Sequence, residues 1–130
     1  MYPAKSLVLA IAAAAALGAC SGDAAPTVEM TSGQRFTPGE ITISAGDEIV
    51  FTNTSGEAHS VTAYSDGFPE GAEYFSSGGF ATESEARDNI TQTLVKAGDS
   101  FELALTEPGT YRYFCIPHEE AGMVGRIVVE

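Results

Sequence analysis

The sequence contains few cysteines, few histidines and few basic residues. Its 130 residues include 2 cysteines, 2 histidines, no tryptophan, and 6 lysines and arginines against 18 acidic residues. Two cysteines are too few for the disulfide framework of a small secreted domain. The formal net charge of −12 disfavours nucleic acid and other anionic partners. We expect the acidic residues to form a solvated surface, with a docking patch for a cationic partner as the alternative.

The sequence also lacks a hydrophobic run long enough to span a membrane comfortably. The run from Leu7 to Leu17 follows Lys5 and precedes small residues, which is the layout of an export signal. The string Leu-Gly-Ala-Cys that ends at Cys20 resembles the lipobox at which prokaryotic lipoproteins are cleaved and acylated. We therefore expect removal of residues 1–19, lipidation of Cys20 and a tether over residues 20–26. The alternative is an ordinary signal peptide with an incidental cysteine.

From residue 27 to residue 130 the sequence predicts one β-rich domain. Short alternating segments are separated by turn sequences rich in Gly, Pro, Asp and Asn, which is typical of a β-sandwich. We predict an all-β, antiparallel Greek-key sandwich. The expected strands are Val28 to Thr31, Glu40 to Ser44, Glu48 to Thr54, His59 to Tyr64, Phe101 to Thr106, Thr110 to Phe114 and Val124 to Glu130.

A long insertion interrupts this pattern between Asp66 and Thr91. The sequence Thr82-Glu83-Ser84-Glu85 fits a capping box, in which Thr82 bonds the amide of Glu85 and Glu85 reaches back, so a short helix should begin there. The insertion is expected to fold as a flap on the edge of the sandwich. Four aromatic side chains should point from it toward the core: Phe68, Tyr74, Phe75 and Phe80.

The segment from Cys115 to Met123 carries the chemistry. It places a thiolate, the imidazole of His118 and a thioether on one strand-loop-strand unit. Two imidazoles and a thiolate with a weak axial methionine form a blue-copper electron-transfer site. Only one other histidine exists, so His59 must supply the second imidazole. The predicted ligands of one copper ion are therefore His59, Cys115, His118 and Met123.

The pattern Cys-x-x-His-x-x-x-x-Met, preceded by Gly-Thr-Tyr, resembles the plastocyanin branch of the cupredoxins. The resemblance covers about residues 27–130. The insertion, the lipobox and the acidity resemble the halocyanins, the membrane-anchored members from halophilic archaea. This resemblance implies a single-electron carrier at the outer face of the cytoplasmic membrane, working between redox proteins of a membrane electron-transport chain. The chain departs from plant plastocyanins at Phe114, where they carry a tyrosine associated with docking.

Elementary chemistry assigns a role to each predicted ligand. Cys115 should be the strong ligand and Met123 a long axial contact, while Pro117 lacks an amide hydrogen that could donate to the thiolate. The apolar residues around His118, namely Ile116, Pro117, Ala121 and Gly122, should surround its exposed edge and form the electron entrance. The alternative is that this loop is apolar because it packs under the insertion.

Other functions remain open from the sequence alone. A zinc site would be expected to use Cys and His pairs rather than Met. A thiol enzyme needs a nucleophile beside an oriented base, and nothing in the sequence offers an open substrate position, so we do not expect an enzyme. A module that stores or delivers copper would show Met-rich or His-rich clusters, and only 3 Met occur. A sandwich without metal is the remaining alternative.

Overall fold

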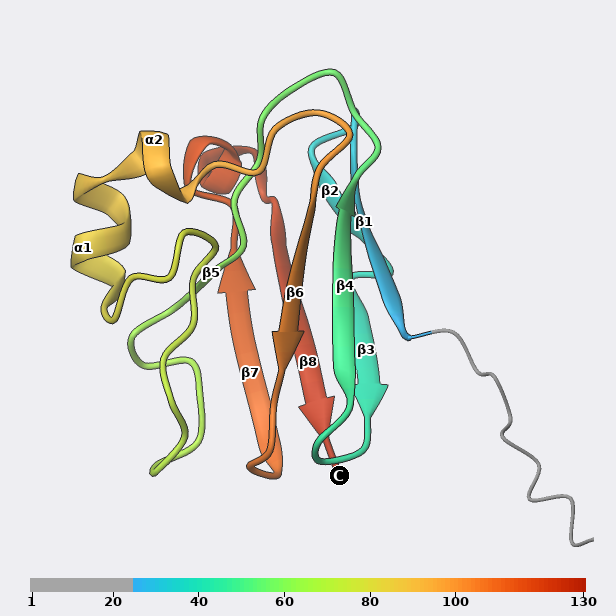
Figure 1. Cartoon of the computed structure of the whole chain (residues 1–130), viewed down its shortest axis with the longest axis vertical. Helices are drawn as coiled ribbons and strands as arrows, with labels where there is room; N and C mark the ends of the chain where they lie inside the picture. The colour runs from blue at the N-terminus through green and yellow to red at the C-terminus, as the bar shows by residue number, and fades with distance from the viewer. Residues whose placement is uncertain (1–24) are drawn as a thin grey trace, which may run out of the picture.

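The computed structural model describes residues 25–130 and shows two β-sheets packed face to face (Figure 1). The strands are β1 (Thr27–Thr31), β2 (Arg35–Thr37), β3 (Glu40–Ile43), β4 (Glu48–Asn53), β5 (Thr62–Ala63), β6 (Ser100–Ala104), β7 (Gly109–Phe114) and β8 (Val124–Val129). The helical segments are α1 (Glu83–Asp88), α2 (Ile90–Thr93) and the 3₁₀ segment η1 (Ile116–Ala121).

Both sheets are mixed. One has the strand order β2-β1-β4-β6 and the other β3-β8-β7-β5. The predicted β-sandwich is confirmed, but the prediction that all its strands are antiparallel is corrected at two pairs, because β1 pairs with β4 and β3 with β8 in parallel. Each parallel pair joins strands that are not consecutive in the chain. A sequence pattern with period two is the same for both directions of pairing, so it does not distinguish them.

The alternating segments bury one face of each sheet. In β4, for example, Ile49, Phe51 and Asn53 are buried while the residues between them are not. Tyr111 and Tyr113 of β7 and the following Cys115 lie on the same buried face, as period-two alternation predicts. The core therefore continues along β7 up to the predicted metal ligand.

The insertion folds beside the edge strand β5, to the left of the sandwich in Figure 1. The predicted helix is present as α1, and the Thr82 side chain accepts from the Glu85 amide at 3.1 Å. Glu85 instead accepts from the amide of Ala81 at 3.3 Å, one residue earlier than a standard capping box. Phe75 is buried, and Phe68 and Tyr74 pack against the core. Phe80 is half-buried.

Three local features differ from the sequence prediction. β2 was not expected, since three residues are too few to show an alternating pattern. The expected strand from His59 to Tyr64 is reduced to the two residues of β5. The loop after Cys115 is a 3₁₀ segment that ends at Gly122, whose φ of 85° favours glycine. These differences lie at the end of the sandwich that carries the predicted ligands.

Among the helices of residues 25–130, none is long and apolar enough to cross a membrane. The predicted signal peptide (residues 1–19) and the lipidated Cys20 lie outside the described residues, as does most of the tether.

One buried polar atom lacks a hydrogen-bond partner among residues 25–130, the hydroxyl of Tyr113. The Tyr113 ring packs edge-on against Phe36, with centroids 4.6 Å apart, and covers Gly125, where an added Cβ would clash with the ring. The hydroxyl is therefore held in an apolar setting, and burial raises the pKa of Tyr113.

We predict that Tyr113→Phe stabilises the protein by about 1 kcal/mol, because it removes an unsatisfied buried hydroxyl while keeping the ring. The matched control is Tyr111→Phe, which deletes a hydroxyl that donates to the Glu107 carbonyl at 2.7 Å. That variant should lose about 1 kcal/mol. Urea unfolding measures both changes, and a Tyr113→Phe variant as destabilised as the control would contradict the assignment.

Candidate metal centre

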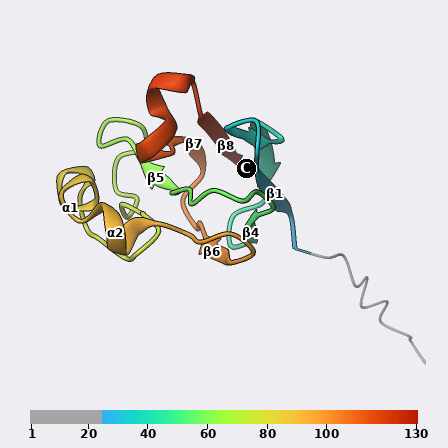
Figure 2. The same cartoon turned by 90° about the horizontal axis from the view of Figure 1, so that it is seen from above.

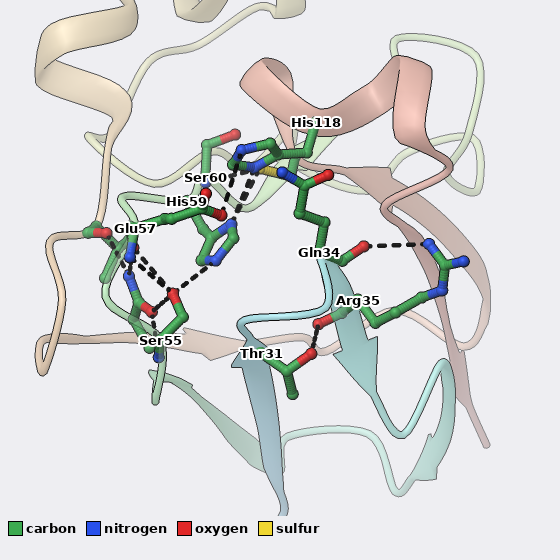
Figure 3. A network of polar contacts seen from close by, with 11 residues as sticks. Thr31, Gln34, Arg35, Ser55, Glu57, His59, Ser60 and His118 are labelled. Atoms are coloured by element: carbon green, nitrogen blue, oxygen red, sulfur yellow. Dashed lines mark hydrogen bonds and ion pairs between the residues drawn. The ribbon is translucent and has the colours of Figure 1, made fainter.

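Three predicted ligands converge at one end of the sandwich. The ligand atoms of His59, Cys115 and His118 all lie within 4.8 Å of one another. Nδ1 of His59 is 3.1 Å from Nδ1 of His118, and Sγ of Cys115 lies 3.7 Å and 3.4 Å from these two nitrogens. Figure 3 shows the two rings facing each other at the centre of the polar network. The structure thus brings three of the four predicted ligands together.

The segment from Cys115 to Met123 is closed by its own backbone. The Cys115 amide donates to the Met123 carbonyl at 3.0 Å, and the Met123 amide donates to the His118 carbonyl at 3.1 Å. These bonds place the backbone of Met123 next to Cys115 and His118, directly before β8. Its side chain is fully buried.

His59 comes from a different part of the chain and is fixed by two sets of bonds. Its backbone forms a bridge with Val95, with N···O distances of 3.1 Å and 2.7 Å. On the side of the ring away from Cys115, Nε2 lies 2.8 Å from the hydroxyl of Ser55. Ser55 is held in turn by the Asn53 carboxamide oxygen at 2.7 Å. A hydrogen bond to the far nitrogen sets ring orientation and leaves Nδ1 to face the site.

Ser60 connects the His59 segment to the Cys115 segment. Its amide hydrogen points to the Cys115 sulfur at 3.4 Å, and its hydroxyl accepts from the Ile116 amide at 2.8 Å. The same hydroxyl lies 3.0 Å from that of Thr62. A bond from a backbone amide stabilises a thiolate, so Ser60 both orients the sulfur and tunes it.

Burial shifts the pKa of both fully enclosed ligands toward the neutral form. Desolvation, followed by the nearby His118, lowers the pKa of His59. Desolvation raises the pKa of Cys115, against the opposing effect of the amides of Ser60 and His118. A neutral imidazole is ready to bind metal, whereas the thiol must release its proton when a metal binds.

His118 is the ligand that reaches the surface. Its side chain is 15% exposed, and Nε2 lies 3.8 Å from a carboxylate oxygen of Glu57. Pro117, Ala121 and Gly122 are exposed around it and Ile116 is half-buried. The alternative in which this loop packs under the insertion is therefore excluded. η1 covers the end of the sandwich above β7 and β8 (Figure 2).

The donor set fits a metal ion in size and chemistry. Bonds of about 2.0 Å to nitrogen and about 2.3 Å to sulfur, with angles near 120°, place the donor atoms about 3.5–3.7 Å apart. The observed separations of 3.1, 3.4 and 3.7 Å are close to the edges of that triangle. Two imidazoles with one thiolate are the equatorial donors of a type 1 copper site, and the backbone of Met123 is bonded to both Cys115 and His118. The site therefore fits a single type 1 copper ion.

Comparison with known proteins agrees with this chemistry. The family described as copper binding proteins, plastocyanin/azurin family, matches residues 24–130. The chain belongs to this family. The major plastocyanin isoform of Arabidopsis thaliana chloroplasts is 35% identical over 125 residues, which are 94% of this chain and 70% of that protein. Plastocyanin of Capsella bursa-pastoris is 38% identical over 94 residues, 72% of this chain and 86% of that protein.

Solved cupredoxin structures share the fold. A mutant plastocyanin of a fern superposes with a TM-score of 0.56 at 26% identity, covering 80% of this chain and 99% of that one. A purple cupredoxin from Nitrosopumilus maritimus gives a TM-score of 0.59 at 19% identity, covering 81% and 99%. The second likeness, at so low an identity, shows the fold alone. The plastocyanin-like cupredoxin fold predicted from the copper motif is thus confirmed.

Sequence reasoning missed the residues that orient the ligands. Asn53, Ser55 and Ser60 are all buried polar residues that bond the His59 and Cys115 segments. The one available signal was a cluster of small polar residues close to a predicted ligand histidine. Such clusters are also typical of turns, so the pattern did not separate the two roles.

Burial of His59 should make the stability of the apoprotein sensitive to acid. Because folding lowers its pKa below the ordinary value of 6.5, the unfolded chain binds more protons there. The stabilisation is present above that value and is lost as pH falls through the folded-state pKa. We expect the urea concentration at the unfolding midpoint of the apoprotein to decrease when the pH is lowered from about 7 to about 5. In His59→Gln the midpoint should depend less steeply on pH. Equal slopes in the two proteins would contradict the prediction.

Proposed function

We propose that the protein is a blue-copper electron carrier, which shuttles single electrons between membrane-associated redox partners. The observation that carries the proposal is the convergence of His59, Cys115 and His118 on one point with Met123 beside them. We assign these four residues as the copper ligands, with Met123 as the weak axial one. Plastocyanin-like cupredoxins are electron carriers rather than enzymes, which agrees with the donor set.

The surrounding residues keep the ligands in one arrangement. A bound copper ion would supply a one-electron couple between Cu(I) and Cu(II). Ser55 holds the far side of the His59 ring, Ser60 holds the sulfur, and the Met123 backbone closes the loop on Cys115. His59, Cys115 and Met123 are fully buried, so neighbouring side chains also restrict their movement. Ligands that do not move keep the cost of rearrangement low for each transfer.

The exposed edge of His118 is the electron entrance that this geometry supports. The other three assigned ligands are fully buried, and His118 has a side chain 15% exposed among the exposed Pro117 and Ala121. A partner that covers this edge approaches the centre without desolvating many charges. Glu57, 51% exposed beside the ring, adds one acidic group to the rim of this surface.

Storage or delivery of copper is the alternative function. A delivery protein passes its ion to ligands of a partner, which requires exposed donors. The sulfur and one imidazole here come from residues that are 0% exposed. That burial favours a carrier of electrons over a carrier of the metal.

We further propose that the protein works at the outer face of the cytoplasmic membrane, held there by a lipid on Cys20. The support is the export-signal layout of the first residues and the Leu-Gly-Ala-Cys string. In this proposal residues 1–19 are removed, residues 20–26 form the tether and the cupredoxin domain spans residues 27–130. The anchor, the acidity and the insertion together support a halocyanin-like member of the family.

The ligand assignment predicts two spectroscopic results. Cys115→Ser should remove the intense blue absorption that appears when Cu(II) is added to the apoprotein, while circular dichroism still shows a β-sandwich. Met123→Leu should keep a coloured centre but raise its reduction potential, since the last axial donor to Cu(II) is lost. A strong blue band in the serine variant, or a lower potential in the leucine variant, would refute the corresponding role.

The anchor predicts how the protein fractionates. The wild type should sediment with membranes, and Cys20→Ala should be released or remain as an unprocessed precursor. Mass spectrometry of the mature N-terminus checks the modification directly. Cleavage elsewhere, or an unmodified Cys20 at the mature terminus, would remove the anchor from the proposal without affecting the copper site.

A further inference from the structure

Arg87, on helix α1 of the insertion, contacts both sides of the predicted ligand loop. Its Nη2 donates to Glu119 at 2.8 Å, and its guanidinium carbon lies 4.3 Å from the centroid of the Phe114 ring. Phe114 directly precedes Cys115, and Glu119 directly follows His118. One side chain from the insertion therefore touches the neighbours of two predicted ligands.

Arg87 is itself held rigidly by the insertion. Its Nε donates to Glu83 at 2.9 Å within α1, and the other oxygen of Glu83 accepts from the Ser65 amide at 2.8 Å. Burial lowers the pKa of Arg87, but its hydrogen bonds to Glu119 and Glu83 outweigh burial and raise the pKa, so the guanidinium stays charged. A side chain anchored at both ends can transmit the position of α1 to the loop.

The η1 segment needs contacts from outside, because few interactions within the segment stabilise it. It contains no buried residue, and the backbone of His118 departs from helical angles within it. The hydrogen bonds of a 3₁₀ helix have poorer geometry than those of an α-helix. Without core side chains, the segment between His118 and Met123 is held mainly by its ends and by contacts from outside.

A second arginine contacts the far end of the same segment. Nη1 of Arg35, which begins β2, donates to the Ala121 carbonyl at 3.1 Å. Figure 3 shows the Arg35 side chain on the side of the site opposite Glu57, where its guanidinium also donates to the Gln34 carbonyl at 3.3 Å. Arg35 bonds a single carbonyl of the ligand loop, whereas Arg87 contacts residues next to both Cys115 and His118, so the hold of Arg35 on the loop is the smaller one.

We propose that Arg87 is a positioning residue for the copper ligands: the insertion, through Arg87, fixes Phe114 and Glu119 and so limits movement of the Cys115–His118 segment. The proposal deepens the proposed function and rests on it for its consequence in electron transfer. The immobilisation of the loop belongs to the protein alone and is present before copper binds.

The test compares Arg87→Gln with Arg126→Gln. The control removes the same charge from another exposed arginine, on β8, whose ion-pair partner is Glu40 of β3 at 3.4 Å. The first readout is hydrogen exchange of the apoprotein amides between residues 116 and 123. The second is the rate at which a chelator removes copper from the loaded protein, and the third is the electron self-exchange rate at high salt.

Loss of a partly exposed ion pair corresponds to about a two- to fivefold change in the equilibrium between the held and the released loop. In Arg87→Gln we expect exchange of amides 116–123 and copper release to rise by that factor, and self-exchange to fall, while the amides of β1 and β4 keep their protection. Arg126→Gln should resemble the wild type. Glu119→Gln should reproduce part of the effect, because it removes the same Arg87–Glu119 ion pair. For the same reason, the double variant should add little to Arg87→Gln.

Unchanged exchange of amides 116–123 in Arg87→Gln, or a loss of protection spread evenly over both sheets, would overturn the proposal. If Arg87→Gln does not fold, Arg87→Lys serves instead, because lysine keeps the charge but lacks the planar fork that reaches Glu83 and Glu119 together. The apoprotein arm also separates two failures. A wild type without a blue centre would refute the proposed function and leave the exchange result standing.

Discussion

The pairing of β7 with a neighbour on each side is the constraint on which the metal centre depends. Phe114, the last residue of β7, pairs with Thr62 of β5 and with Val124 of β8. Cys115 follows immediately, so its sulfur emerges between the segment that carries Ser60 and the segment that carries Met123. The Ser60 amide that points to the sulfur and the Met123 carbonyl that accepts from the Cys115 amide come from these two neighbours. A shift of one residue in either pairing would turn Cys115 away from the core.

The centre joins this rigid strand end to a less rigid loop. His59 and Cys115 sit in the buried part, where backbone bridges and serine hydroxyls satisfy their polar groups. His118 sits on η1, which contains no fully buried residue and is bonded by arginines from outside the loop. This separation of buried and surface ligands suits electron transfer. The buried donors hold the geometry of the site, and the exposed imidazole gives a partner access to it.

Burial also sets the energetics of the four-residue site before a metal binds. Two imidazoles and a thiol point at one another within 4.8 Å, and burial favours the neutral form of His59 and of Cys115. A metal ion replaces these close contacts between donors with bonds to itself, so binding free energy is added to folding free energy. The protein should therefore be more stable with copper than without it.

The sequence by itself determined the chemistry and the fold class. Cys115, His118 and Met123 lie within nine residues, and a single other histidine exists, so His59 followed by exclusion. Alternation along the strands predicted the sandwich and put Tyr111 and Tyr113 on the face of Cys115, because side-chain direction in a strand is a local property. The cap at Thr82 is local for the same reason.

Only the tertiary structure decided what depends on contacts between distant segments. The parallel pairing of β1 with β4 and of β3 with β8 joins segments whose local patterns are the same in either direction. Ser55 and Ser60 look like turn residues until the fold brings their hydroxyls to His59 and Ile116. The contact of Arg87 with Glu119 spans 32 residues. No period in the sequence records such a contact, because it exists only after the insertion has packed against the sandwich.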